Sequence, residues 1–109
     1  MNVAEIIKNS SRTAFSFEVL PPLKGNSIDK VFDTIDALRE FDPKYINITS
    51  HRSEFIYKAA DNGLYQRVSE KSRPGSVAVA AAIQYKYRIP AVPHLICSGF
   101  TKIETEYAL

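Results

Sequence analysis

The chain of 109 residues has one cysteine, four glycines and no tryptophan. The single Cys97 rules out an internal disulfide and suits a reducing compartment. The longest apolar stretch falls far short of the ~20 residues that cross a bilayer, which argues against a transmembrane helix. Residues 1–8 lack the basic start and unbroken apolar core of a signal peptide, so we expect a cytoplasmic protein.

The chain also has no large excess of charge of either sign. Fourteen Lys and Arg against twelve Asp and Glu leave a formal charge of +2, and the basic residues are scattered along the chain. This pattern disfavours nucleic acid or an anionic membrane as the main partner. A composition of 45% hydrophobic and 24% charged residues is typical of a globular domain.

Hydrophobic periodicity predicts an alternation of strands and helices. Three segments alternate between large apolar and small or polar residues, which predicts strands at 13–19, 45–49 and 91–97. Spacings of three and four, together with capping residues, predict helices at 4–8, 28–41, 77–87 and 102–109. Ser27 is the expected N-cap of the second helix, and Pro43 requires that helix to end near Asp42.

Between the second strand and the Ala-rich helix lies a segment of a different kind. Asn62-Gly63 stands between two apolar stretches, which is a hairpin signal. We therefore interpret residues 52–73 as a hairpin-like insertion after strand two.

The order of elements favours the α/β class, with parallel strands joined by crossover helices. A (β/α)₈ TIM barrel is built from such units but needs eight of them and roughly 250 residues. This chain supplies three, and residues 104–109 stop in mid-helix without a capping residue. We therefore expect residues 1–109 to form one partial domain, the N-terminal third of a TIM barrel. A small independent α/β domain is the alternative.

Each predicted strand has two unlike faces. Large apolar residues share the first face, which we expect the helices to cover: Phe15, Phe17, Val19, Ile46, Ile48, Pro93, Leu95 and Cys97. The second faces jointly present Glu18, Asn47, Thr49 and His94. Polar chemistry at the C-terminal ends of parallel strands is where barrels and doubly wound sheets place their sites.

Glu18 is the strongest candidate for a functional residue among these four. A carboxyl group at the mouth of a buried strand is desolvated, which raises its pKa and suits general acid catalysis. A partly exposed carboxylate that accepts hydrogen bonds from the following loop is an equal alternative. His94, Thr49 and Asn47 are weaker candidates, because each can serve packing alone, and Cys97 is interpreted as an inert packing residue.

Other site chemistries have little support. The two histidines stand far apart, with no Cys pair or carboxylate cluster between them, so no metal site is expected. Neither a GxGxxG nor a P-loop motif occurs. A phosphate- or RNA-binding site is a remote alternative, and it would use the basic group His51, Arg52, Arg67, Lys71 and Arg73.

Three sequence motifs resemble those of one protein family, and they occur in the same order along the chain as in that family. Residues 15–22, Phe-Ser-Phe-Glu-Val-Leu-Pro-Pro, resemble the Ser-Phe-Glu-Phe-x-Pro-Pro opening of methylenetetrahydrofolate reductases. Residues 45–49 resemble their second strand, which ends in Thr, and residues 93–97 are similar to their His-Leu-Thr-Cys third strand. The resemblance covers the whole chain but only about the first third of the family's catalytic TIM barrel.

This resemblance implies a FAD-dependent enzyme. NAD(P)H reduces the flavin, which then reduces 5,10-methylenetetrahydrofolate to 5-methyltetrahydrofolate. By position, Glu18 would supply the proton that the opened folate ring needs, and Thr49 and His94 would line the flavin site. We expect the protein to be a homo-oligomer, and we expect the isolated chain to be inactive and to retain no FAD.

This chain also departs from the family. Ser50 and Gly99 replace an aromatic and an acidic residue that many relatives carry, and the family's Arg-Gly-Asp segment would lie beyond Leu109. The alternative function is a non-catalytic α/β binding or assembly module that keeps the barrel strands. Its motivation is the open sheet edge that three parallel strands leave.

Overall fold

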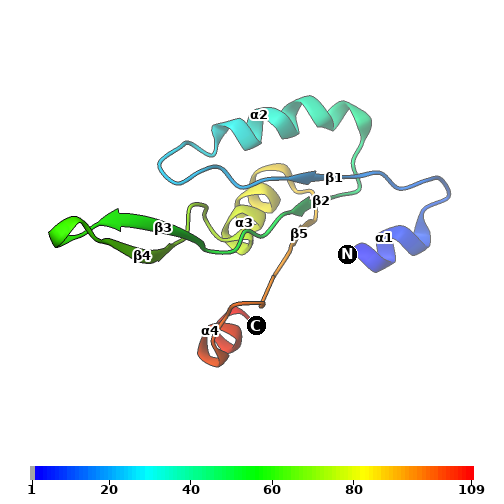
Figure 1. Cartoon of the computed structure of the whole chain (residues 1–109). Coiled ribbons are helices and arrows are strands. Elements are labelled where there is room, and N and C mark those ends of the chain that lie inside the picture. The colour runs from blue at the N-terminus through cyan, green and yellow to red at the C-terminus, as the bar shows by residue number, and fades with distance from the viewer. Residues whose placement is uncertain (1) are drawn as a thin grey trace.

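The computed structural model describes residues 2–109. They form a three-stranded sheet with two helices packed on it, a β-hairpin, and a short helix near each end of the chain (Figure 1). The helices are α1 (Val3–Asn9), α2 (Asp29–Leu38), α3 (Ser76–Tyr87) and α4 (Lys102–Ala108). The strands are β1 (Ser16–Val19), β2 (Tyr45–Ile48), β3 (Glu54–Ala59), β4 (Tyr65–Glu70) and β5 (Ala91–Pro93). Among these residues, no helix is long and apolar enough to cross a membrane.

The central sheet has the strand order β1-β2-β5, and both pairs are parallel. Helix α2 connects β1 to β2, and α3 precedes β5, so the chain follows the crossover pattern that the sequence predicts. The prediction of a mixed α/β fold with parallel strands is confirmed.

One face of this sheet carries the core. Ile46 and Ile48 of β2 are fully buried, as the alternation predicts. They pack with Ile35 of α2 and Ile83 of α3, which are also fully buried. Both helices therefore cover the same face of the sheet, and within residues 2–109 no helix packs on the opposite face.

Helix α2 begins and ends near the predicted residues. The Ser27 hydroxyl accepts a 3.1 Å hydrogen bond from the Asp29 N–H, although the N-cap position itself is Ile28. At the other end a 3-10 turn, Arg39–Phe41, leads to Asp42, which has a left-handed φ of 50°. Pro43 follows directly and is buried, so the helix stops where the proline requires.

The hairpin signal at residues 61–63 is confirmed. Strands β3 and β4 pair antiparallel over their whole length, and Asn62 and Gly63 in the turn have φ of 65° and 71°. Asn and Gly adopt this left-handed conformation at least cost.

The third strand is shorter than the predicted 91–97. It ends at Pro93, and the His94 N–H still donates to the Ile48 carbonyl at 2.9 Å. Strand β2 ends at Ile48, so residues 95–97 have no strand residue of β2 to pair with. The expectation that helices cover Leu95 is accordingly wrong, because Leu95 lies beyond the paired strand and is 41% exposed.

Phe15 also departs from the prediction. It was expected on the covered face, yet it is 60% exposed, because β1 begins only at Ser16. Its carbonyl accepts the Lys44 N–H at 2.8 Å, and its ring borders a surface hollow that Phe41 also lines. Phe41 lies past the end of α2 and is exposed as well, so the predicted apolar stripe of that helix stops short of it.

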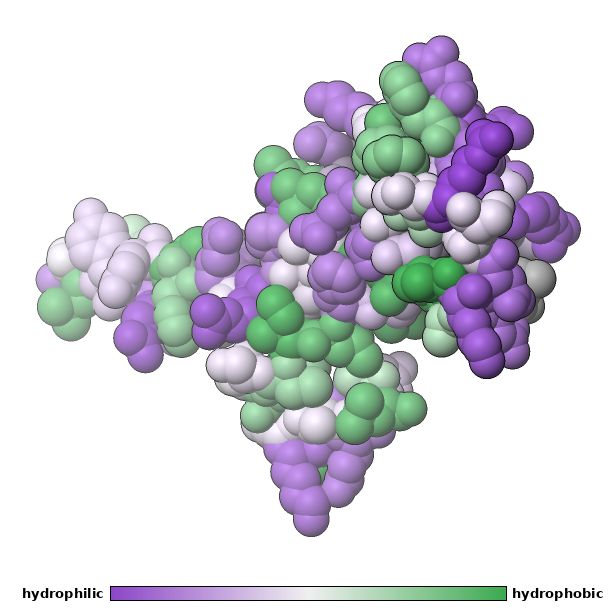
Figure 2. All heavy atoms as spheres, turned by 90° about the vertical axis from the view of Figure 1, so that its right-hand side faces the viewer, coloured by the Kyte–Doolittle hydropathy of each residue, from purple (hydrophilic) through white to green (hydrophobic). Residues whose placement is uncertain are grey.

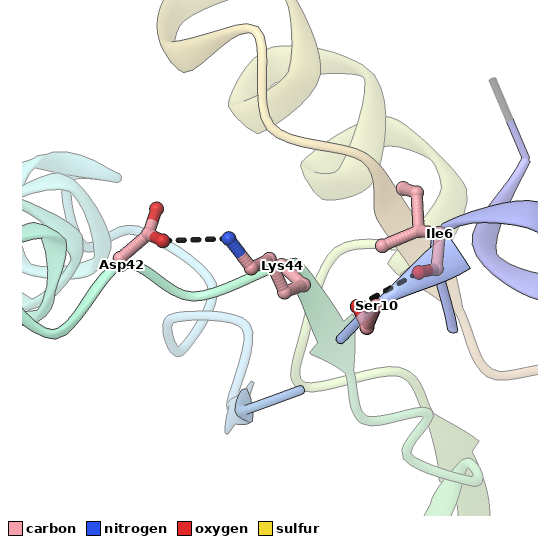
Figure 3. A network of polar contacts seen from close by, with 4 residues as sticks. All are labelled: Ile6, Ser10, Asp42 and Lys44. Carbon is pink, nitrogen blue, oxygen red and sulfur yellow. Dashed lines mark hydrogen bonds and ion pairs between the residues drawn. The ribbon is translucent and has the colours of Figure 1, made fainter. Parts of the chain in front are cut away.

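Two local polar contacts lie near the amino end of the sheet (Figure 3). The Ser10 hydroxyl donates to the Ile6 carbonyl at the end of α1 at 2.9 Å. Lys44 extends towards Asp42, and Nζ lies 2.6 Å from Oδ2. These contacts lie at the opposite end of the strands from the polar residues that the sequence singled out.

The molecule is elongated, with extents of 65 × 31 × 21 Å and a radius of gyration of 17.6 Å. A compact chain of this length would have a radius of gyration of ~13 Å. The β3–β4 hairpin projects to one side of the sheet and α4 lies below it (Figure 1). Figure 2 shows the lower projection with a hydrophilic tip and hydrophobic side chains between the tip and the body.

Candidate functional site

Polar side chains gather at the carboxyl ends of the three parallel strands. Glu18 of β1 lies opposite Asn47 of β2, which in turn lies opposite Val92 of β5. Residues two apart share a face of a strand. Thr49 and His94 therefore follow Asn47 and Val92 on the face that carries Glu18, away from both helices.

Glu18 and Thr49 are in direct contact. The Thr49 hydroxyl donates a 2.8 Å hydrogen bond to Oε1 of Glu18. The Thr49 N–H also donates to the Val19 carbonyl at 3.0 Å, which extends the β1–β2 ladder by one step. The backbone thus holds the hydroxyl beside the carboxylate, and the predicted meeting of these two residues is observed.

His94 forms a second pair, with Asn47. Its Nε2 lies 3.4 Å from Oδ1 of Asn47, so a hydrogen bond there requires the proton on Nε2. The Ser76 hydroxyl donates to the His94 carbonyl at 2.6 Å. Ser76 is the buried first residue of α3 and fixes the backbone of His94. The periodicity of the sequence does not single out Ser76, although a serine beside Gly75 at a helix start is a signal that its hydroxyl bonds to backbone.

The two pairs are linked through β2, which carries Asn47 and leads directly to Thr49. The predicted set Glu18, Thr49 and His94 thus lies on one face and at one end of the sheet. Within residues 2–109, hydrogen bonds join Glu18 to Thr49 and His94 to Asn47, but none joins one pair to the other.

The expected desolvation of Glu18 is wrong for this chain. Glu18 is exposed, while Thr49 and His94 are partly buried. The reason is the uncovered face of the sheet, because no other element of residues 2–109 packs over the Glu18 side chain. The structure instead matches the alternative of a carboxylate open to solvent, although its hydrogen bond comes from a hydroxyl and not from the loop.

Beside Glu18, a cleft of about 400 Å³ opens between the end of β1 and the first turns of α2. Arg73 lies at its edge and donates from Nη1 to the Pro21 carbonyl at 2.5 Å. The Lys24 N–H donates to the Ser72 carbonyl at 2.7 Å. Together these bonds attach the loop after β1 to the connector between β4 and α3.

The arrangement combines a carboxyl group with hydroxyl, amide and imidazole groups on an open face. A carboxyl group can exchange a proton with a ligand, and the other three can hydrogen-bond the edge of a planar heterocycle. Residues 2–109 contain no cluster of three His, Cys, Asp or Glu side chains placed to hold a metal ion. The groups present on this face are suited to proton transfer and hydrogen bonding.

Comparison with known proteins identifies one family. A family model described as methylenetetrahydrofolate reductase matches residues 2–109, which is essentially the whole chain. No curated protein and no solved structure matches the chain.

Proposed function

The chain belongs to the methylenetetrahydrofolate reductase family, and we propose on that basis that it supplies the N-terminal part of a folate-reducing active site. The reaction is the reduction of 5,10-methylenetetrahydrofolate to 5-methyltetrahydrofolate by FAD, with NAD(P)H as the hydride donor. The observation that carries the proposal is the Glu18–Thr49 contact on the uncovered face of the sheet.

In this proposal, β1, β2 and β5 are the first three strands of an eight-stranded TIM barrel. Both helices lie on one face of the sheet, and polar groups cluster at the strand ends on the other. In a barrel the first face becomes the outside and the second the interior. The hairpin within 52–73 is then an insertion after strand two, and further βα units cover Glu18.

The residues on this face fit a flavin. An isoalloxazine ring presents hydrogen-bond donors and acceptors along one edge, and the Thr49 hydroxyl and the His94 imidazole offer complementary groups. Thr49 and His94 would hold the ring, and FAD would supply hydride transfer when bound. Asn47 contacts His94 and so orients its imidazole ring.

The role we assign to Glu18 is that of the general acid. Reductive opening of the folate's five-membered ring leaves an amine nitrogen that needs a proton. The Glu18 carboxyl group donates this proton and becomes a carboxylate, which then accepts the Thr49 O–H. A charge-assisted hydrogen bond of this kind is stronger than a neutral one, so Thr49 stabilises the state that Glu18 reaches after proton transfer.

The test is Glu18→Gln in a full-length enzyme that carries this chain. Flavin reduction by NAD(P)H should stay largely intact and folate reduction should fall by about 100-fold or more, because general acid catalysis typically contributes 10²–10⁴-fold. The matched control is Glu40→Gln, which neutralises an exposed carboxylate beyond the end of α2. Equal loss of both half-reactions would contradict the acid role, and a non-catalytic module would show neither half-reaction.

A further inference from the structure

The β3–β4 hairpin forms an arm that makes extensive contacts only with itself. Figure 1 shows the arm extending beyond the end of the central sheet. A two-stranded hairpin is at best marginally stable in water without a packing partner. Large side chains are nevertheless exposed along it, with Phe55 59% and Tyr57 68% accessible to solvent. This exposure points to an interaction surface.

The outer edge of β3 has a defined hydrogen-bonding pattern. The Ala60 N–H donates to the Leu64 carbonyl at 2.8 Å, in the same register as the rest of the hairpin. Inter-strand bonds of an antiparallel pair involve alternate residues, so the even-numbered residues of β3 bond to β4. Phe55 and Tyr57 therefore direct their backbone N–H and C=O groups away from β4, towards an edge that is unpaired within residues 2–109.

This edge is complementary to a second copy of itself. When two β3 strands run antiparallel about a two-fold axis at Ile56, Phe55 of each copy lies opposite Tyr57 of the other. These are the residues whose backbone groups face outwards, so the register satisfies the hydrogen bonds. In the same register Glu54 of each copy lies opposite Lys58 of the other, which gives two opposite-charge pairs and two aromatic pairs.

The outer edge of β4 is not complementary in charge to a second copy of itself. Its charged residues are Arg67 and Glu70, which are three positions apart and so lie on opposite faces of the strand. No antiparallel register that satisfies the edge hydrogen bonds can set them opposite one another. A register centred on Arg67 places two guanidinium groups together. Charge complementarity therefore selects β3 as the pairing edge.

We propose that two copies of this chain associate through β3, antiparallel about Ile56, to form a four-stranded sheet in the order β4-β3-β3-β4. An isologous contact of this kind closes on itself and gives a dimer, not a fibre. Because only one six-residue strand is contributed by each copy, the interface is small and the dimer is reversible. The inference concerns assembly and is independent of the proposed enzyme activity.

The experiment is a charge swap, read by sedimentation over a concentration series of the 109-residue chain. In a dimer of the Lys58→Glu variant, residues 54 and 58, which face each other, both carry carboxylates. In a dimer of the Glu54→Lys variant, both carry ammonium groups. Each single variant should raise the dissociation constant of the dimer by about tenfold or more, because two attractive pairs become repulsive. An equimolar mixture of the two variants, and the double variant, should each recover the dimer.

The control is Lys24→Glu, which makes the same change of charge at an exposed residue of the loop after β1. It should leave the dissociation constant unchanged. Recovery in the mixture also shows that the single variants fold. A wild-type chain that stays monomeric up to millimolar concentration would overturn the proposal. So would a dimer that Lys58→Glu leaves intact, since another edge of the molecule would then form the contact.

Discussion

The Thr49 hydroxyl and Oε1 of Glu18 lie 2.8 Å apart, although 31 residues separate them in the sequence. The parallel register of β1 and β2 brings them together, because Val19 lies opposite Ile48 and Thr49 continues the ladder. The contact thus follows from the crossover through α2.

Substitutions at Thr49 test that contact. Thr49→Val replaces the hydroxyl with a methyl group of similar size. In a full-length enzyme it should lower the rate of folate reduction about 10- to 100-fold, the range that corresponds to losing a hydrogen bond to a charged group. Thr49→Ser keeps the donor and should retain most of the rate. Equal rates for the Val and Ser variants would show that the hydroxyl does not act on Glu18.

A second prediction concerns the cofactor. The 109-residue chain should purify without the visible absorbance of a flavin, because only Thr49 and His94 are proposed here as cofactor contacts and the face that bears them is open to water. Absorbance spectra after incubation with FAD and gel filtration measure this directly. A yellow sample with one flavin per chain would contradict the prediction.

The core gives a prediction of stability. Ile35→Val removes one buried methylene group and should lower the free energy of unfolding by about 0.5–1.5 kcal/mol. The control is Ile103→Val in α4, where the side chain is 77% exposed and the change should stay within about 0.5 kcal/mol. Urea unfolding at matched concentration measures both, and equal effects would contradict this placement of the core.

Tyr87 gives a prediction of pH dependence. Its hydroxyl donates to the Phe32 carbonyl at 2.9 Å and so joins α3 to α2. Burial, followed by the neighbouring Asp36 carboxylate, raises the pKa of Tyr87 from 10.0 to about 12. Since the neutral form is favoured in the folded chain, this contribution to stability is complete below pH 10 and is lost as the pH rises through about 12.

Tyr87→Phe therefore removes a tyrosine whose pKa is raised to about 12. Ultraviolet titration of the folded wild-type chain should show a component near pH 12 that the variant lacks. The variant should also lose about 0.5–1.5 kcal/mol of stability at neutral pH, the usual contribution of one hydrogen bond. An unchanged titration curve would place the raised pKa on another group.

Local patterns predicted the parts of the fold whose partners lie within the chain. The alternation of Ile46 and Ile48 identified the buried face of β2, and Asn62-Gly63 identified the hairpin turn. Thr101 caps α4 through reciprocal hydrogen bonds with Glu104, two neighbours in the sequence. Each of these features depends on interactions between neighbouring residues, or on one face of one element.

The predictions failed where the outcome depends on neighbours that the chain does not provide. Leu95 was assigned to a covered face, but a strand extends only as far as its partner, and β2 ends at Ile48. Burial of Glu18 required an element over the second face of the sheet. Periodicity in one segment reports which residues share a face, and it contains no information on what covers that face.

The site was predictable to a similar degree. Glu18, Thr49 and His94 were placed on one face because the period of a strand is two. The pairing of His94 with Asn47, and the support from Ser76, depend on side-chain geometry across three elements, and the spacing of residues does not determine it.

The bond from the Lys24 N–H to the Ser72 carbonyl has a consequence for hydrogen exchange. That amide can exchange with solvent only when the loop after β1 separates from the connector that follows β4. Its protection factor therefore reports the opening of both segments at once. The polypeptide that borders the Glu18 cleft should therefore open together with the base of the hairpin, as one cooperative unit.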